Sequence, residues 1–355
     1  MKKIHYFILC ILTFWSASTA QTLYVANSNP GATSGTNVFT GSTAITDALA
    51  VASNGDIIYV VPSQVSYGTV TIAKEITLFG IGLRPSKDIA VSSYLKEIFI
   101  DASNVRLSGL IVDQDVNVGL NLSSTTVSNI TIENSRIGRI EMGSSNNVTV
   151  SNMLVRNNVI EGYGTVATSI LLYTISNVTI TNNIIFTSCC TAPSLRVTGA
   201  TITYNVFMSD GNRGVDANLV ANNFDHNIFY GVNVNLQSGV SINNVWTDNL
   251  SFGGTQLTFV DDGTDGNTGS GNMENVDPLF SDPPPISRDW NNSYDFTLSA
   301  SSPALNINGE DIGPSGGLTP FDPEGNLLPL IQTVTIPSTI AVGSDLPVTI
   351  KAKGN

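Results

Sequence analysis

The chain has 355 residues, of which 31 are glycine and only 12% are charged, and it carries a formal net charge of −13. This composition is typical of many short strands joined by turns and argues against a helical protein. The acidic balance excludes nucleic acid as a partner, because phosphate backbones bind basic surfaces. An anionic polymer would be repelled unless a divalent cation mediated the contact.

The start of the chain has the pattern of an export signal. Lys2 and Lys3 precede an apolar run over residues 8–15, and small residues lead to Ala20. We expect cleavage between Ala20 and Gln21, which leaves 13 basic and 28 acidic residues, a net charge of −15. The mature protein is therefore expected to be secreted or at the cell surface. No later segment has the roughly 18 consecutive apolar residues of a membrane helix, so we expect no membrane span.

One helix is predicted near the N-terminus, over residues 43–52, with Thr43 as N-cap and Gly55 just beyond its end. A strand pattern, Gly-Asp-Ile-Ile-Tyr-Val-Val, follows at 55–61. This run resembles the start of right-handed parallel β-helix proteins of the pectate-lyase-like superfamily, in which a short amphipathic helix and a similar strand open the coil. The resemblance implies a fold and, by itself, no activity. The helix would cap the first turn and shield its apolar interior from water.

The early turns of the expected coil are long. The phrase Leu-x-Gly-apolar occurs at 78–81 and 107–110, and related phrases occur at 132–135 and 155–158. If Gly80, Gly109, Ser135, Asn158 and Asn183 are taken as equivalent corner residues, the successive turns have lengths of 29, 26, 23 and 25 residues. Longer steps indicate loops that leave the coil, and loops on a rigid scaffold are common places for function.

A regular repeat follows, in which the same corner asparagine recurs with a 22-residue period. The repeated residues are Asn183, Asn205, Asn227 and Asn249. A fixed period with alternating apolar residues and no helical spacing predicts a solenoid of parallel strands about 4.8 Å apart. Asparagine suits such a corner because it tolerates left-handed backbone angles and its amide bonds to the equivalent amide one turn away.

Towards the C-terminus, residues 263–271 are rich in Gly, Asp, Asn and Thr and are predicted to form a flexible loop. Closely spaced oxygen ligands at 261–267 suggest either calcium or a solvated loop. The series over 277–313, with its Asp-Pro and Ser-Pro turns, resembles the closing segment of many exported bacterial β-helix proteins, and we expect it to cover the last turn. The Pro-rich residues beyond 317 form either a small strand pair or a linker.

Cys189 and Cys190 are adjacent and are the only cysteines of the mature chain. They either close a vicinal disulfide or remain two thiols at a turn. Neither is expected to be catalytic.

Charged side chains of neighbouring turns are paired by the predicted steps. The 23-residue step sets Glu133 beside Arg156, and the 26-residue step sets Asp113 beside Arg139. Both are interpreted first as surface ion pairs of about 0–1 kcal/mol.

The same 26-residue step sets Asp115 against Glu141, and two adjacent carboxylates need compensation from a cation, a raised pKa, or Arg136 and Arg139. With Asp113, this patch is a candidate calcium site. It resembles in kind, though not in motif, the acid-and-arginine grooves of polysaccharide lyases. A carboxylate pair about 5 Å apart also fits a retaining glycosidase. The candidate catalytic residues are therefore Asp115, Glu141, Arg139 and Arg136.

His226 is the second candidate, because one 22-residue step leads from Tyr204 to His226 and another leads from His226 to Asp248. A His-Asp contact is a general acid/base element, which makes both His226 and Asp248 candidate catalytic residues. The alternative is a polar residue filling a corner column that also contains Asn182.

The sequence predicts an all-β protein, a single right-handed parallel β-helix (solenoid) with an N-terminal capping helix, and a monomer. The expected parts are residues 1–20 (signal peptide), 21–317 (β-helix with its closing segment) and 318–355 (Pro-rich extension). Two functions remain open: binding or degrading an extracellular polysaccharide, and a non-catalytic surface, adhesion or structural role. If the charged side chains of the patch converge in a groove, the polysaccharide-degrading function is favoured. If they lie flat and paired, the non-catalytic role, with the coil as a rigid spacer, is favoured.

Overall fold

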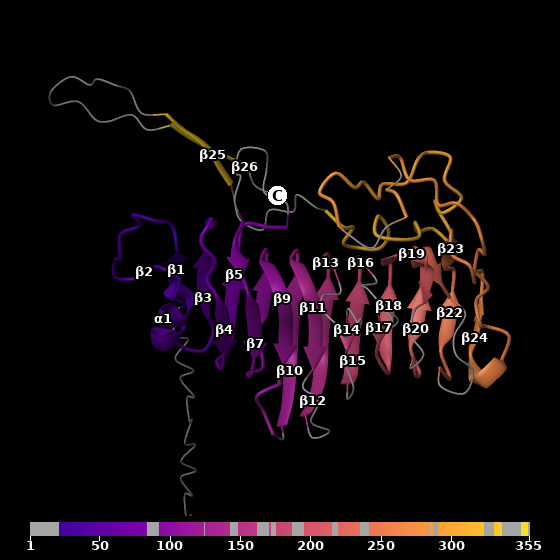
Figure 1. The fold of residues 1–355 in the computed structure, drawn as a ribbon, viewed down its shortest axis with the longest axis horizontal. Coiled ribbons are helices and arrows are strands. Elements are labelled where there is room, and N and C mark those ends of the chain that lie inside the picture. Colours follow the sequence, from indigo (N-terminus) through magenta and orange to yellow (C-terminus); the bar gives the residue numbers. More distant parts are fainter. Residues whose placement is uncertain are drawn as a thin grey trace, which may run out of the picture.

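A computed structural model describes residues 21–83, 92–123, 125–142, 148–161, 170–171, 175–186, 195–214, 219–234, 241–282, 284–286, 290–322, 330–335 and 349–353. Over these residues the predicted parallel β-helix is confirmed: strands of successive turns stack in two long parallel sheets (Figure 1). The predicted leader and the Cys189-Cys190 pair lie outside the described residues.

Sheet A runs the length of the coil. In spatial order it contains β2 (Val38–Thr40), β1 (Leu23–Asn27), β3 (Asp56–Val60), β5 (Ile76–Phe79), β8 (Arg106–Ser108), β10 (Thr125–Glu133), β12 (Val148–Arg156), β15 (Ile175–Thr181), β18 (Ala200–Thr203), β20 (Asn223–Asp225), β22 (Val245–Thr247) and β24 (Thr268–Ser270).

Sheet B faces sheet A across the core. It contains β4 (Thr69–Ile72), β7 (Glu97–Ile100), β9 (Ile111–Val118), β11 (Arg136–Met142), β13 (Val159–Ile160), β16 (Ile184–Phe186), β19 (Val206–Gly214), β21 (Ile228–Asn233) and β23 (Leu250–Phe252), with β6 (Tyr94–Leu95), β14 (Ile170–Leu171) and β17 (Leu195–Arg196) paired beside this path.

One inward column of sheet A shows how the core is filled. Ile180 pairs with Ile202, which pairs with Phe224, which pairs with Trp246, so each step along the column is one 22-residue period. All four side chains are fully buried. Phe224 and Trp246 stack with their ring centroids 4.1 Å apart. Like residues of successive turns therefore form continuous stacks, as the period predicts.

The predicted asparagine ladder is confirmed at the corner between the two sheets. Oδ1 of Asn205 accepts from the backbone N–H (3.0 Å) and the side-chain amide (3.0 Å) of Asn183, and Asn227 and Asn249 continue the pattern. The ladder extends in both directions beyond the predicted members, to Asn158 and Asn272. Each amide thus satisfies buried backbone groups that the corner leaves without a strand partner.

A second ladder, which sequence analysis missed, lies at the other end of the sheet A strands. Asn222, Asn244 and Asn267 are buried and repeat the same amide geometry. In earlier turns an exposed amide ladder stands at the adjacent position of this corner, and its members are Asn104, Asn129, Asn152 and Asn177. All four have positive φ angles, which asparagine accepts most readily of the non-glycine residues.

The predicted capping helix is α1 (Ala44–Val51). Its buried face, which includes Ile45 and Leu49, packs beside β1 and β3 at the N-terminal end of the coil (Figure 1). Thr43 occupies the N-cap position, but its hydroxyl donates to Oδ2 of Asp47 (2.9 Å) and not to the backbone. Among the described residues, no helix has the length and apolarity that crossing a membrane requires.

The expectation of a flexible loop at 263–271 is wrong. This stretch contains a short 3-10 helix, η1 (Thr264–Gly266), and β24, which pairs with β22. Asn267 continues the second ladder, so the glycine- and asparagine-rich composition reflects corner geometry and not mobility. Phe259 closes this end of the core, because its ring packs against those of Trp246 and Phe229, with centroids 5.7 Å apart in each pair.

The closing segment is placed differently from the prediction. It folds back over the outer face of sheet B, which includes Leu250 of the last turn, and does not close the end of the coil (Figure 1). Here it forms a second apolar cluster, in which Phe280, Phe296 and Ile312 bury Val206 and Ile228 of the sheet. The late strands of sheet B are therefore buried on both faces, which explains why β16 and β19 begin with unbroken apolar triplets.

Within the C-terminal extension, β25 (Leu330–Thr335) and β26 (Thr349–Lys353) form an antiparallel pair. The pairing agrees with one of the two alternatives, a strand pair packed on the end of the coil, and that packing stays a prediction.

Candidate functional site

The predicted acid-and-arginine patch lies on the outer face of sheet B, but its register differs from the prediction. Arg139 pairs with Asp115, and Glu141 pairs with Asn117, because the register shifts at a bulge between Ile137 and Arg139. The two carboxylates are therefore not directly opposite each other. The predicted contacts of Asp115 with Glu141 and of Asp113 with Arg139 are wrong.

The error comes from the choice of corner residue. The backbone N–H of Leu110 donates to the hydroxyl of Ser135, so these two residues occupy equivalent positions in successive turns. The corner residue equivalent to Gly109 is therefore Asn134, and not Ser135. A 25-residue step therefore applies before the bulge. A 24-residue step applies after it, where Arg139 meets Asp115.

Arg139 lies between the two acids and binds both. Its guanidinium donates to Asp115 at 3.2 and 2.7 Å, and it lies 2.6 Å from Oε2 of Glu141. The side chains of Arg139, Asp115 and Glu141 are 13%, 17% and 19% exposed. This arrangement neutralises most of the repulsion that the sequence predicted.

The remaining members of the patch lie apart from this cluster. Arg136 forms its own bidentate pair with Glu161, at 2.7 and 3.1 Å. Asp113 is exposed and lies in the irregular stretch of β9. The five predicted residues therefore do not converge, and both arginines of the patch are occupied by carboxylates.

The electrostatics of the patch follow from burial. Burial raises the pKa of Glu141, Arg139 counteracts the rise, and Asp115 adds to it. Burial also acts to lower the pKa of Arg139, but its hydrogen bond to Asp115 and the charges of Asp115, Glu141 and Glu97 outweigh this and raise it. A carboxyl with a raised pKa suits a general acid, yet Glu141 is held by Arg139, and the neighbouring acid Asp115 is bound to the same arginine.

The predicted pair of Glu133 and Arg156 is confirmed, but it is not a surface pair. The Glu133 side chain is fully buried on sheet A between two arginines, Arg106 and Arg156, and it also accepts from Ser108 at 3.1 Å. Arg156 Nε lies 2.8 Å from Oε2, and Arg106 binds Oε1 through two nitrogens. Burial favours the neutral acid, but the hydrogen bonds and charges of the two arginines lower the pKa of Glu133 below its ordinary value.

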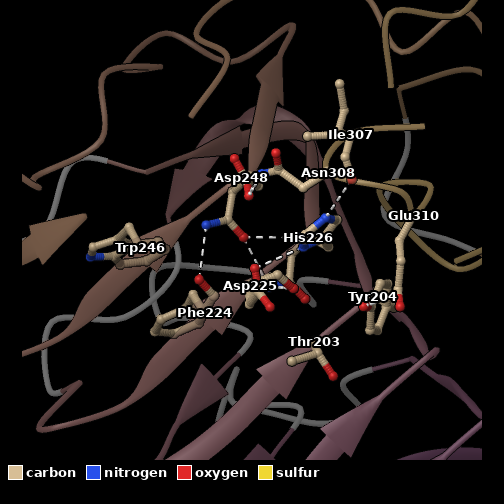
Figure 2. Close-up of polar contacts among 12 residues, drawn as sticks. Thr203, Tyr204, Phe224, Asp225, His226, Trp246, Asp248, Ile307, Asn308 and Glu310 are labelled. Atoms are coloured by element: carbon tan, nitrogen blue, oxygen red, sulfur yellow. Dashed lines mark hydrogen bonds and ion pairs between the residues drawn. The ribbon is translucent and has the colours of Figure 1, made fainter. Parts of the chain in front are cut away.

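The second candidate, His226, lies in the corner column between the sheets (Figure 2). Its neighbours in the column are Tyr204 and Asp248, as the 22-residue period predicts, and all three have positive φ angles: 56° for Tyr204, 54° for His226 and 51° for Asp248. The rings of Tyr204 and His226 lie 5.4 Å apart. The column is therefore confirmed, and the left-handed corner accounts for its position in each turn.

His226 uses both ring nitrogens, as Figure 2 shows. Nδ1 lies 2.7 Å from Oδ1 of Asp225, and Nε2 lies 3.3 Å from the carbonyl oxygen of Ile307. The hydrogen bond to Asp225 raises the pKa of His226, burial lowers it, and the Ile307 carbonyl and the charges of Asp225 and Asp248 raise it further, with a net rise. The direct partner of His226 is thus the preceding residue in sequence, and not Asp248.

Asp248 is held by the closing segment, because Asn308 donates to its Oδ2 at 2.6 Å. Tyr204 donates to Glu310 of the same segment. Carboxylate oxygens of Asp225 and Asp248 and a ring nitrogen of His226 lie within 4.8 Å of one another, and the 2.7 Å contact of Asp225 with His226 is the shortest contact of the ring.

Sequence analysis missed Asp225 and the residues of the closing segment. Asp225 adjoins His226, so its proximity was visible in the sequence. Asn308 and Glu310 lie far along the chain from His226 and share no period with it, so no sequence signal links them to the corner.

No family model matches this chain, and no curated protein sequence matches it.

Proposed function

We propose that this protein is an exported, non-catalytic β-helix that acts as a rigid spacer or adhesion module at the cell surface. The proposal rests on one observation, the saturation of the charged groups in both candidate clusters. Arg139 joins Asp115 and Glu141, and both nitrogens of His226 are engaged. A hydrolase or lyase needs a free acid or base within reach of its substrate. Within the described residues, neither the Arg139 cluster nor the His226 cluster presents one.

The fold supports a mechanical role. Amide ladders and ring stacks link successive turns, and the outer apolar cluster adds a second layer to the late turns. Stability in such a coil is distributed over many nearest-neighbour interfaces. Export enters the proposal through the sequence pattern of the leader, and N-terminal sequencing of the mature protein should begin at Gln21.

The first experiment is a search for activity. The purified protein is incubated with polyuronates and neutral glycans, with and without calcium, while the absorbance of unsaturated products and the appearance of reducing ends are followed. We expect no product from any glycan. Product formation would overturn the proposal, and the variants Asp115→Asn and His226→Asn would then show which site is responsible.

A second candidate function is binding of polysaccharide without cleavage. Arg106 and Arg156 surround one carboxylate, and their side chains remain 44% and 31% exposed. This leaves a local excess of positive charge on an acidic protein, suited to the hydroxyls or carboxylates of a sugar chain. Affinity electrophoresis in gels containing each glycan tests it. Retardation that is lost in Arg106→Gln but kept in Arg136→Gln would favour binding, and unretarded migration in every gel would favour the spacer.

A further inference from the structure

A strap of the closing segment, residues 304–317, lies along the corner column that carries His226. The backbone N–H of Gly313 donates to the carbonyl oxygen of His226 at 2.8 Å. Further along the column, the Asn182 amide donates to the carbonyl oxygens of Pro314 (3.2 Å) and Gly316 (2.8 Å). The strap therefore follows the column across successive turns.

The strap coincides with an exception in the column. Three consecutive turns carry Tyr204, His226 and Asp248 at the left-handed position, which aspartate and histidine accept more readily than most non-glycine residues, so Tyr204 is the unusual side chain. Each of the three contacts the strap: Tyr204 through Glu310, His226 through Ile307, and Asp248 through Asn308. These contacts join three successive turns of the column to the strap. Other turns place glycine or asparagine at this position: Gly109, Asn134, Asn157, Asn182 and Gly271.

The geometry around His226 favours a doubly protonated ring. Both partners of the ring, the Asp225 carboxylate and the Ile307 carbonyl oxygen, are acceptors. A neutral imidazole carries one N–H, so it donates to only one of them and turns a lone pair towards the other. Because the carboxylate is the stronger acceptor, the bond to Ile307 of the strap is the one that is lost.

We propose that His226 is a protonation-dependent latch that holds the strap, residues 304–317, on the β-helix. The charged groups that act on it are Asp225 from β20 and Asp248 from the corner after β22, and Glu310 of the strap binds the neighbouring Tyr204. The two aspartates together favour the imidazolium ion. Tyr204 lies beside the ring, tilted by 35°, and stays a donor to Glu310, because burial and Glu310 raise its pKa.

The direction of the switch follows from the raised pKa of His226. Its stabilising effect is fully present below the ordinary value of 6.5 and is lost as the pH rises through the raised folded-state value. The latch is therefore closed below pH 6.5 and loosens as the pH rises through the raised pKa of His226. Opening would uncover part of the outer apolar cluster, since Ala304 and Ile312 of the strap pack there with Val206 and Ile228.

The column itself supplies a matched control. His226→Asn introduces the residue that three earlier turns carry, keeps the left-handed corner and cannot titrate. Hydrogen exchange of peptides from 304–317 is measured across pH 6–9, corrected for intrinsic exchange, in the wild type and the variant. In the wild type, the corrected exchange of the strap should rise in a step as His226 loses its proton. Above this step the strap should open about tenfold to a hundredfold more often than below it, the range for one charged hydrogen bond. The variant should show no step.

A second measurement keeps the test decisive if His226→Asn fails to fold. The chain has two histidines, and the other, His5, lies in the predicted leader, so the ring resonances of His226 can be followed by NMR in the mature protein. We expect its pKa to lie above 6.5 and to fall in Asp225→Asn. A His226 that titrates at or below 6.5, or strap exchange that has the same pH profile in wild type and His226→Asn, would overturn the latch.

Discussion

The backbone N–H and the side-chain amide of Asn205 both donate to Oδ1 of Asn227, one turn further along the coil, at 2.9 Å each. Asn227 in turn donates to the carbonyl oxygens of Ile202 and Asp225 and to Asn249. Both asparagines are fully buried. Each asparagine side chain therefore forms hydrogen bonds with backbone groups of its own turn and of the turn before it, so the loss of one side chain affects two turns.

Asn227→Ala should destabilise the coil by about 3 kcal/mol or more. The change leaves the buried backbone N–H of Asn205 without an acceptor and removes the amide that donates to the carbonyl oxygens of Ile202 and Asp225, at about 1–3 kcal/mol for each unsatisfied group. The shift is measured as the change in denaturant midpoint, followed by circular dichroism. The control is Asn152→Gly, which removes an exposed amide of the other corner and keeps its positive φ. An equal loss in both variants would show that the buried ladder has no special role.

Glu133→Gln should destabilise the protein by about 1.5–3 kcal/mol at neutral pH, because it removes charge-assisted hydrogen bonds from Arg106 and Arg156. Since the folded-state pKa of Glu133 lies below the ordinary 4.5, its stabilising effect is present above 4.5 and lost as the pH falls through the folded value. The wild type should therefore lose stability in acid more steeply than Glu133→Gln. Parallel curves of unfolding midpoint against pH would contradict this assignment.

Glu141→Gln should have the opposite pH signature. The pKa of Glu141 is raised, so its folded form takes up a proton before the unfolded chain does, and this raises stability as the pH falls towards 4.5. The variant should lack this rise and remain within about 0.5 kcal/mol of the wild type at neutral pH, because loss of the Arg139 contact is offset by relief of repulsion from Asp115. The same titration of unfolding midpoints measures both variants, and a loss at neutral pH as large as that of Glu133→Gln would refute the distinction.

Periodicity made the late turns predictable from sequence. The 22-residue step places Asn183 and Tyr204 in their correct columns because the turns there have constant length. The early turns are different, because a bulge in the pairing of β9 and β11 replaces a 25-residue step by a 24-residue step within one strand. A bulge leaves the apolar alternation almost intact, so Asp115 could not be paired correctly by counting along the chain.

The contacts of the strap were beyond sequence reasoning for a different reason. Each turn of a solenoid contacts its sequence neighbours, whereas Asn308 reaches Asp248 from 60 residues away. The unbroken apolar triplet of Val206 to Met208 was the available signal that the outer face is covered. That signal shows that a cover exists, but it does not identify which segment provides it.

Arg139→Gln should make stability depend on calcium. Without the guanidinium, Asp115 and Glu141 lose their shared cation, and oxygen ligands with net negative charge attract a divalent ion. Thermal unfolding with millimolar calcium, compared with a chelator, should show a higher midpoint with calcium in the variant and no change in the wild type. A calcium response in the wild type would mean that the patch binds the ion despite Arg139.

Substitutions of Trp246 measure how much the stability of the last turns depends on ring stacking. Its ring is fully buried and stacks on Phe224, and among the described residues its Nε1 has no hydrogen-bond partner. Trp246→Phe keeps a stacked ring and removes the unsatisfied donor, so we expect a loss below about 1.5 kcal/mol. Trp246→Ala leaves a cavity beneath Phe259 and should cost about 3–5 kcal/mol. The midpoint of chemical unfolding is followed by circular dichroism, because both variants lose a tryptophan and their fluorescence cannot be compared with that of the wild type. Equal losses in both variants would indicate that the indole N–H has a bound water as its partner, and that the stability of this end depends on a polar contact as well as on the stack.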